Sequence, residues 1–265
     1  MKFFLVLTTF ILVNSISTAP TNSTNEDVLL CLEEFYYAAY NLKFNCTERY
    51  EFFSNDLTTQ HNSFKVGKEC FLQVVQEKCT TEQYDLLVSK YDDFLRALTT
   101  VPTNDPECTS TYYSYNSARC FAMMKRTKLD SSEVYFASEV KQNDPKLLKT
   151  IALCYETEEC LASSCISPDV ARKEIETTCD TMELRNSAYY MCIKAIEKEL
   201  PHMSRYKCLG GVSYNDPSIY VQKKLWTENK SCVKEILEDQ CGKKAVENFD
   251  KYSAMTAKGF EMLSG

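Results

Sequence analysis

Hydrophobic residues recur at steps of three and four along several stretches of the chain. One stretch contains Val28, Leu32, Phe35, Tyr36, Ala39 and Tyr40. Another contains Tyr84, Leu87, Tyr91, Phe94, Leu95 and Leu98. This spacing places the apolar side chains on one face of a helix, and such a face is normally buried. Both stretches therefore predict amphipathic helices.

Capping residues mark several helix ends. An N-cap acceptor precedes a proline at Asp144-Pro145, Ser167-Pro168 and Asp216-Pro217. Thr80 and Gln83 form a capping-box pattern, and Gly242 predicts a helix stop. The chain has only six glycines and seven prolines, which is too few turn residues for an all-β protein. We therefore expect an all-α fold.

The cysteine spacing contains an internal repeat. From Cys31 the steps are 15 to Cys46, 24 to Cys70 and 9 to Cys79, and from Cys192 they are 16 to Cys208, 24 to Cys232 and 9 to Cys241. The segment KECFLQVVQEKC aligns with KSCVKEILEDQC, and Lys90-Tyr91 aligns with Lys251-Tyr252 after one deletion. One supersecondary unit therefore occurs twice. We expect two small disulfide-stabilised helical domains.

The expected domain plan has four parts. Residues 1–17 have the charged start, short apolar run and small residues of a secretory signal peptide, and the run is too short to remain as a membrane anchor. Residues 18–124 form a first domain with six cysteines, and residues 144–265 form a second domain with eight. Residues 125–143 contain no cysteine and are rich in charge and serine, which predicts a linker. Both counts are even, so each domain can close its own disulfides.

All fourteen cysteines are expected in disulfides, because a secreted chain matures in an oxidising compartment. They are Cys31, Cys46, Cys70, Cys79, Cys108, Cys120, Cys154, Cys160, Cys165, Cys179, Cys192, Cys208, Cys232 and Cys241. Zinc is not expected, since no Cys-x-x-Cys pair occurs. If Cys70 and Cys79 lie in one helix, nine residues separate them by about 13.5 Å, beyond the ~7 Å Cα limit for a disulfide. Each must pair elsewhere.

The same argument applies to Cys232 and Cys241. The cluster of Cys154, Cys160 and Cys165 should likewise bond to separate partners. The full connectivity stays open, because six cysteines allow 15 patterns and eight allow 105.

The compartment expected from the signal peptide and cysteines is extracellular. Three Asn-x-Ser/Thr sequons, at Asn22, Asn45 and Asn229, are consistent with glycosylation there. No further segment is apolar for long enough to span a membrane, and the C-terminal residues lack the hydrophobic tail of a lipid-anchor signal.

The charge and the histidines limit the possible functions. A formal net charge of −7 argues against nucleic acid and against electrostatic docking to anionic membranes. The two histidines, His61 and His202, lie outside any hydrolase or metalloprotease motif and are interpreted as surface residues. Adjacent acids such as Asp92 and Asp93 diverge by about 100° on a helix and do not face one substrate. We expect no enzyme activity, no cofactor and no metal.

Tyrosine is abundant, with seventeen in the chain. Tyr36, Tyr40 and Tyr91 have the periodicity of core residues. Tyr112, Tyr113 and Tyr115 lie in the polar stretch TSTYYSYNS, which predicts an exposed loop. Because tyrosine combines contact area with a polar tip, these three residues are the candidate binding surface.

Four segments carry a family resemblance: KECFLQVVQEKC, CLASSC, CDTMELRNSAYYMC and CVKEILEDQCGKKAVENFDKY. Together they resemble a nematode family of secreted cysteine-rich proteins known as domain of unknown function nineteen. The similarity is strongest from Cys154 to Tyr252, and the first domain lacks a counterpart of the Cys154, Cys160 and Cys165 cluster. The resemblance implies extracellular residence and a helical cystine-linked fold, without a known activity.

Together these features predict a secreted, non-catalytic extracellular binding or structural protein. Its partner would be an unknown extracellular protein. The alternative is a carrier of a small apolar ligand such as a lipid, because cystine-linked helices can enclose a cavity and the chain is rich in aromatic residues.

Overall fold

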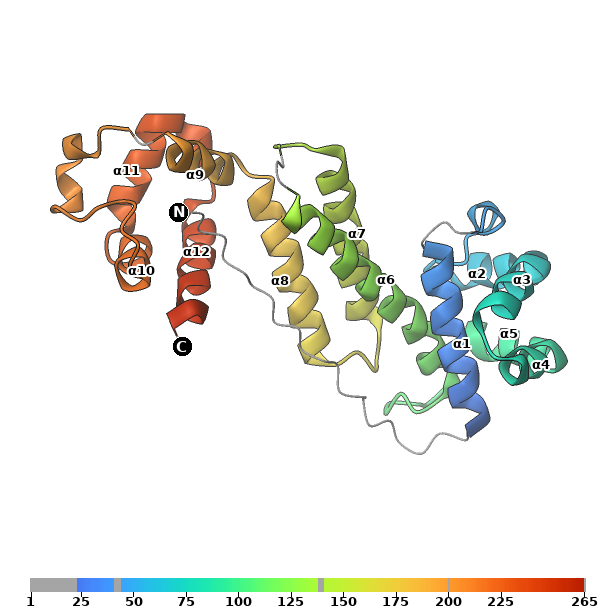
Figure 1. Ribbon diagram of the computed structural model, residues 1–265. Coiled ribbons are helices and arrows are strands. Elements are labelled where there is room, and N and C mark those ends of the chain that lie inside the picture. The colour runs from blue at the N-terminus through green and yellow to red at the C-terminus, as the bar shows by residue number, and fades with distance from the viewer. Residues whose placement is uncertain (1–22, 41–43, 138–140, 200, 265) are drawn as a thin grey trace. The chain divides into compact units, whose positions relative to one another are not determined.

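The computed structural model describes residues 23–40, 44–137, 141–199 and 201–264, and all regular secondary structure within them is helical (Figure 1). The predicted signal peptide and Asn22 lie outside these residues. The chain divides into two compact units, which are treated separately below. The larger unit contains the described residues of 17–137 and 149–180, and the smaller unit contains those of 138–148 and 181–265.

The helices of the larger unit are α1 (Ser23–Tyr40), η1 (Thr47–Arg49), α2 (Leu57–Val66), α3 (Lys68–Lys78), α4 (Thr81–Ser89), α5 (Tyr91–Thr99), α6 (Thr111–Phe136) and most of α7 (Pro145–Ser163) and α8 (Asp169–Arg185). Those of the smaller unit are α9 (Ala188–Lys198), η2 (Met203–Arg205), η3 (Lys207–Leu209), α10 (Ile219–Thr227), α11 (Lys230–Cys241), η4 (Lys243–Val246) and α12 (Phe249–Ser264).

An aromatic cluster forms the main core of the larger unit. Helix α1 packs along α6 and α3 (Figure 1). The Phe35 and Phe71 ring centroids lie 4.7 Å apart, and Phe71 stacks on Phe94 at 5.3 Å. These rings come from α1, α3 and α5, so both predicted amphipathic faces are buried as expected. The second predicted helix is interrupted at Lys90, which divides it into α4 and α5.

Disulfides repeat one pairing pattern in the two copies of the duplicated unit. In the first copy the bonds are Cys31–Cys79 and Cys46–Cys70, and in the second they are Cys192–Cys241 and Cys208–Cys232. The remaining bonds are Cys108–Cys165, Cys120–Cys160 and Cys154–Cys179. The predictions that Cys70 does not pair with Cys79, and that the clustered cysteines bond to separate partners, are confirmed. All fourteen cysteines are paired.

The expected linker at 125–143 is wrong for residues 125–136, which belong to helix α6. Its buried face there is largely polar, so a search for apolar periodicity does not find it. Thr127 is fully buried because its hydroxyl pairs with that of Thr157 at 2.8 Å, and Asp130 is buried beside Arg126 at 2.7 Å. Hydrogen bonds and an ion pair thus replace the apolar contacts that normally reveal a helix.

The expected disulfide closure within residues 18–124 and 144–265 is also wrong. Two bonds, Cys108–Cys165 and Cys120–Cys160, join residues on opposite sides of the expected boundary. Even cysteine counts allow separate closure, but the packing of α6 against α7 decides otherwise. A second core of cystine sulfurs with Leu161 and Ile175 lies among α6, α7 and α8.

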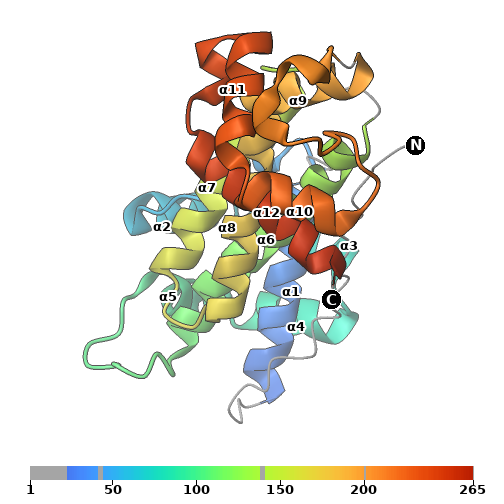
Figure 2. The ribbon, with the colours of Figure 1, turned by 90° about the vertical axis from the view of Figure 1, so that its left-hand side faces the viewer.

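The smaller unit has its own aromatic core, in which Tyr189 contacts Trp226, Phe249 and Tyr252. Figure 2 shows α10 lying along α12 in this unit. The Tyr206 hydroxyl donates to Asp239 at 2.6 Å. This bond is the main cause of the lowered pKa of the Asp239 carboxyl.

Most predicted helix ends are found. Thr80 forms the capping box, the Asp144 carboxylate accepts from the Lys146 N–H at 2.9 Å, and Gly242 ends α11 with a positive φ of 79°. Ser167 does not cap α8, whose first residue is Asp169. Its buried hydroxyl has no hydrogen-bond partner.

Asp216 is likewise not the N-cap of α10. Its carboxylate accepts from the Ser218 N–H at 2.9 Å in the preceding turn. The helix begins at Ile219, with Ser218 as its N-cap.

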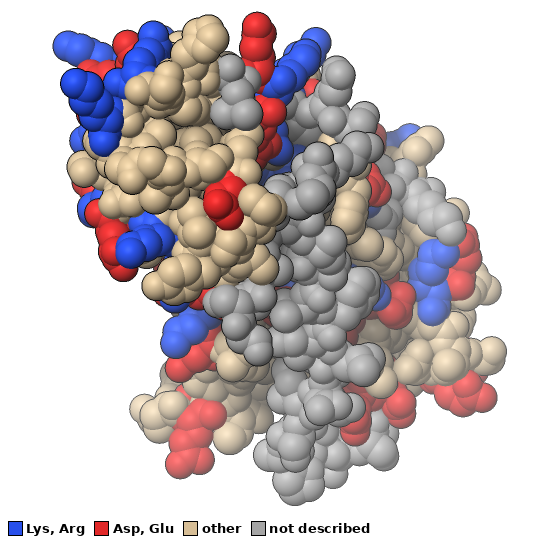
Figure 3. Space-filling model, turned by 60° about the vertical axis from the view of Figure 1, so that its left-hand side comes forward, with Lys and Arg blue, Asp and Glu red and all other residues tan. Residues whose placement is uncertain are grey.

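Charges of both signs are interspersed on the molecular surface shown in Figure 3. The net charge of −7 is therefore not gathered in one acidic patch on that face. Among the described residues, no helix is long and apolar enough to cross a membrane.

Candidate functional site

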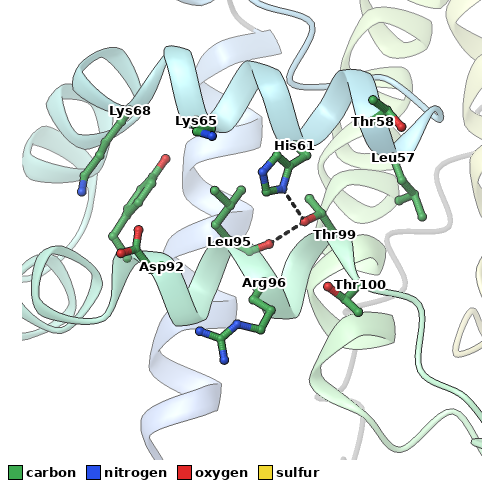
Figure 4. A pocket seen from close by; sticks show the side chains of 11 residues that line it. Leu57, Thr58, His61, Lys65, Lys68, Asp92, Leu95, Arg96, Thr99 and Thr100 are labelled. Atoms are coloured by element: carbon green, nitrogen blue, oxygen red, sulfur yellow. Dashed lines mark hydrogen bonds between the residues drawn. The ribbon is translucent and has the colours of Figure 1, made fainter.

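A polar groove of about 670 Å³ lies between α2 and α5 in the larger unit (Figure 4). Eleven residues line it: Leu57, Thr58, His61, Lys65, Lys68, Tyr91, Asp92, Leu95, Arg96, Thr99 and Thr100. The volume is in the range of small-molecule sites. Below it, Phe64 of α2 and Phe94 of α5 lie in the aromatic core, with ring centroids 5.9 Å apart. The two walls are therefore fixed by the core.

Local contacts set the positions of these walls. The Asp56 carboxylate caps α2 by accepting from the Thr59 N–H at 2.8 Å, and the Tyr91 hydroxyl donates to the Phe64 carbonyl at 2.6 Å. Gly67 joins α2 to α3. A Cβ atom there would lie 2.6 Å from the Ser63 carbonyl oxygen, so only glycine fits this turn without displacement.

His61 has a defined orientation in the groove. Its Nδ1 lies 3.0 Å from the Thr99 hydroxyl, which itself donates to the Leu95 carbonyl at 2.8 Å (Figure 4). Because the hydroxyl proton is used in that second bond, Nδ1 must be the donor to Thr99. The neutral ring therefore carries its proton on Nδ1 and keeps Nε2 as an acceptor.

The two predicted surface histidines thus have different surroundings. His61 is half-buried and its ring is hydrogen-bonded to a threonine, whereas His202 is exposed just before η2. A hydrolytic histidine is typically oriented by a carboxylate and paired with a nucleophile. The Thr99 hydroxyl that contacts His61 has already donated its proton to the backbone.

The groove carries more positive than negative side chains. Lys65, Lys68 and Arg96 line it, against the single carboxylate of Asp92. The Lys68 ammonium lies 4.2 Å from the centre of the Tyr91 ring, an arrangement that a cation–π interaction favours. The site is therefore locally cationic in an acidic protein.

Some of this positive charge has a partner beside the groove. Arg96 pairs with Asp93 at 3.1 Å, and both side chains are well exposed. Such an exposed pair contributes little to stability. The Arg96 guanidinium points away from α2, and part of its charge is offset by Asp93 (Figure 4).

The second copy of the duplicated unit has different side chains at the positions that line the groove. Counting from the aligned Lys-Tyr pairs, Phe260 stands where the first copy has Thr99. Phe260 packs against the aromatic core of the smaller unit, and α10 packs more extensively on α12 than α2 does on α5. Lys223, at the position of His61, forms an ion pair with Glu261 at 3.0 Å. The second copy thus has an aromatic ring and an ion pair where the first copy has Thr99 and His61.

The predicted tyrosine surface is only partly present. All three tyrosines lie in α6, so the expected loop is wrong. Tyr115 is 4% exposed, its ring lies 5.7 Å from that of Phe94, and burial raises its pKa to about 12. It is a core residue and cannot belong to a binding surface. Tyr112 and Tyr113 are half-buried and line a second pocket of about 360 Å³.

That second pocket is organised by Arg119. This residue is 6% exposed, and its guanidinium donates to the Phe53 and Ser54 carbonyls at 3.0 and 2.7 Å and to the Asn55 side chain at 2.6 Å. These bonds hold the segment before α2 against α6. Arg119 therefore has a structural role that its position in a polar stretch does not reveal.

Two of the three sequons lie within the described residues. Asn45 is exposed, but its sequon includes Cys46, which is bonded to Cys70, and Thr47, whose hydroxyl donates to the Phe44 carbonyl at 2.8 Å. Asn229 is half-buried at the N-cap of α11. Glycosylation at these positions stays a prediction.

The sequence does not reveal the groove residues, because their spacing matches no catalytic or ligand-binding motif. An alignment of the two copies does point to the groove, because the small polar Thr99 of the first copy aligns with the aromatic Phe260 of the second. Within the described residues, no group of three or more His, Cys, Asp or Glu side chains could hold a metal ion.

The fold and disulfide framework define a duplicated, cystine-linked all-helical protein. Comparison with family models places the chain more narrowly. It belongs to the family described as domain of unknown function (DUF19), whose model matches residues 17–109 and again residues 108–261. Searches of curated proteins and of solved structures found no match to the chain. The two family matches meet just before α6 rather than at the expected linker.

Proposed function

We propose that this protein is a secreted, non-catalytic extracellular binding protein, and that the α2–α5 groove is its ligand site. The observation that carries the proposal is the difference between the two copies. The same supersecondary unit packs Phe260 against its core and forms the Lys223–Glu261 pair in one copy, and has a groove beside Thr99 and His61 at these positions in the other.

The cost of an open groove supports this interpretation. An aromatic side chain such as Phe260 gains free energy when it packs against a core, whereas Thr99 leaves that surface to water. The second copy shows that the unit can accommodate the larger side chain. Retaining a polar groove in the first copy is reasonable if a ligand occupies it.

Seven disulfides and the signal-like N-terminus support residence outside the cell. Disulfides fix both ends of α3, whose first residue Lys68 lines the candidate site, since Cys46–Cys70 holds the start of α3 and Cys31–Cys79 holds its end against α1. A rigid wall reduces the ordering cost of binding. This framework suits recognition rather than catalysis that requires a mobile lid.

The polar lining favours binding of a polar ligand over lipid transport. A carrier of apolar ligands needs a cavity lined mainly by hydrophobic side chains. Nine of the eleven groove residues instead have polar or charged side chains, and Leu57 and Leu95 are the two aliphatic ones.

Native mass spectrometry of the full chain, purified gently from the extracellular medium, tests the proposal. We expect the wild-type protein to carry a co-purified small molecule and Thr99→Phe, which copies Phe260, to lose it. Val88→Phe on α4 is the matched control, because Val88 is exposed and lines neither pocket. A wild-type mass free of ligand, or equal retention by Thr99→Phe, would overturn the proposal.

A further inference from the structure

We infer that the α2–α5 groove recognises a small organic anion through a phosphate or sulfate group. The inference rests on the proposed function and adds the chemical class of the ligand. Its basis is the pair of lysines at one end of the lining, Lys65 of α2 and Lys68 at the start of α3, together with the threonine hydroxyl groups further along the groove (Figure 4).

The chemistry of the lining matches an oxyanion that is attached to a polar body. Lysine ammonium groups bind phosphate as point charges, and arginine adds a planar donor edge. Thr58 and Thr100 contribute hydroxyl groups to the lining. Such groups both donate and accept, so they suit the hydroxyls of the part of the ligand that carries the anion.

Lys65 and Lys68 are the residues with most charge available to a ligand. Neither forms an ion pair with a carboxylate among the described residues, and Lys68 is held over the Tyr91 ring at 4.2 Å. Arg96 already shares its charge with Asp93 at 3.1 Å, so its contribution is smaller. Removal of a lysine should therefore weaken binding more than removal of Arg96.

The acidic character of the whole protein favours a small anion over a long polyanion. Charges beyond about 8 Å are largely screened at physiological ionic strength, so a ligand inside the groove mainly meets the local cations. A long polyanion would extend beyond that distance over a protein whose net charge is −7. Asp92, at the Tyr91 end of the groove, also limits the number of negative groups that fit.

Titration of the full chain, followed by ¹H–¹⁵N NMR at constant ionic strength, tests the inference. The probes are inorganic phosphate, inorganic sulfate, glucose 6-phosphate and uncharged glucose. We expect saturable shifts at amides of α2 and α5 with glucose 6-phosphate and weaker ones with the two inorganic ions. Glucose alone should cause none. The two inorganic ions distinguish phosphate from sulfate as the preferred group.

Charge variants locate the binding. Lys65→Ala and Lys68→Ala should each weaken glucose 6-phosphate binding about fivefold, the factor that corresponds to ~1 kcal/mol. Lys230→Ala is the matched control, because Lys230 occupies the position of Lys68 in the second copy and pairs with Asp250 at 3.1 Å. It should leave binding unchanged.

Two outcomes would overturn the inference. One is the absence of saturable shifts with any anionic probe, and the other is an equal effect of Lys68→Ala and Lys230→Ala. If a co-purified ligand is lost in Thr99→Phe but carries no acidic group, the anion inference fails while the proposed function stands. If no ligand co-purifies but anions bind the groove, the proposed function fails as a description of the secreted protein.

Discussion

Removal of equivalent disulfides from the two copies should cause equal losses of stability. Cys46–Cys70 and Cys208–Cys232 each span 24 residues and occupy the same place in the duplicated unit. In the chain-entropy description, a loop of that length restricts the unfolded chain by about 3.5 kcal/mol at 25 °C. Replacing both cysteines of either bond by alanine avoids a leftover thiol and should cost about that much.

The longer disulfides allow the losses of stability to be compared within each unit. Cys31–Cys79 and Cys192–Cys241 span 48 and 49 residues, about twice the separation of the shorter bonds. Doubling the loop adds only about 0.6 kcal/mol, so their removal should cost about 4 kcal/mol. Within each unit, the loss of the long bond should therefore be slightly larger than the loss of the short one.

Denaturant-dependent hydrogen exchange, read by mass spectrometry of peptides from each unit, measures these losses separately. A single unfolding free energy for the whole chain is not defined when two units can open at different denaturant concentrations. A difference of more than about 1 kcal/mol between the two short bonds would refute the chain-entropy explanation. Removal of a short bond that costs more than removal of the long bond in the same unit would refute it as well.

Three further predictions concern single residues and thiols. Tyr206→Phe removes the hydroxyl that donates to Asp239 and should slightly destabilise the smaller unit. The pKa of the Asp239 carboxyl is lowered in the folded protein, so its hydrogen bond stabilises the fold above the ordinary pKa of 3.8, and this stability is lost as pH falls through the folded-state pKa. Tyr206→Phe should therefore reduce the dependence of urea unfolding on acid pH. An unchanged pH profile would contradict the role of the Tyr206–Asp239 bond. Gly67→Ala should lower the free energy of unfolding by about 1–3 kcal/mol, because the added methyl group overpacks against the Ser63 carbonyl. The loss should appear as faster amide hydrogen exchange in α2. Exchange at the wild-type rate would show that the turn accommodates the methyl group. Alkylation of the folded protein should add no mass before reduction and fourteen adducts after reduction and unfolding, and earlier labelling would show that a bond is missing.

The cysteine order by itself allows strong geometric exclusions. Helical rise rules out a Cys70–Cys79 bond, and the structure places their partners at Cys46 and Cys31. The pairing itself does not follow from the order, because it depends on which helices become neighbours. Cys108 and Cys165 are 57 residues apart in sequence and meet only because α6 packs against α7.

Helix α6 shows where pattern reasoning fails. The sequence predicts a loop for its first turns and a linker for its last turns, because tyrosine, serine and charged residues dominate both segments. Thr127 and Ser131 are nevertheless buried, and the hydroxyl of Thr127 is paired with that of Thr157. Periodicity identifies a buried face only when that face is apolar.

The sequence alone determined the all-helical class, the duplicated cystine framework, the use of every cysteine in a bond, and the two principal apolar faces. These properties follow from local spacing, which fixes the side of a helix on which each residue lies. Only the tertiary structure decided the disulfide partners, the division of the chain into units, and the open groove beside His61. These depend on contacts between residues far apart in sequence, where the packing of whole helices selects one arrangement among several that the local pattern allows.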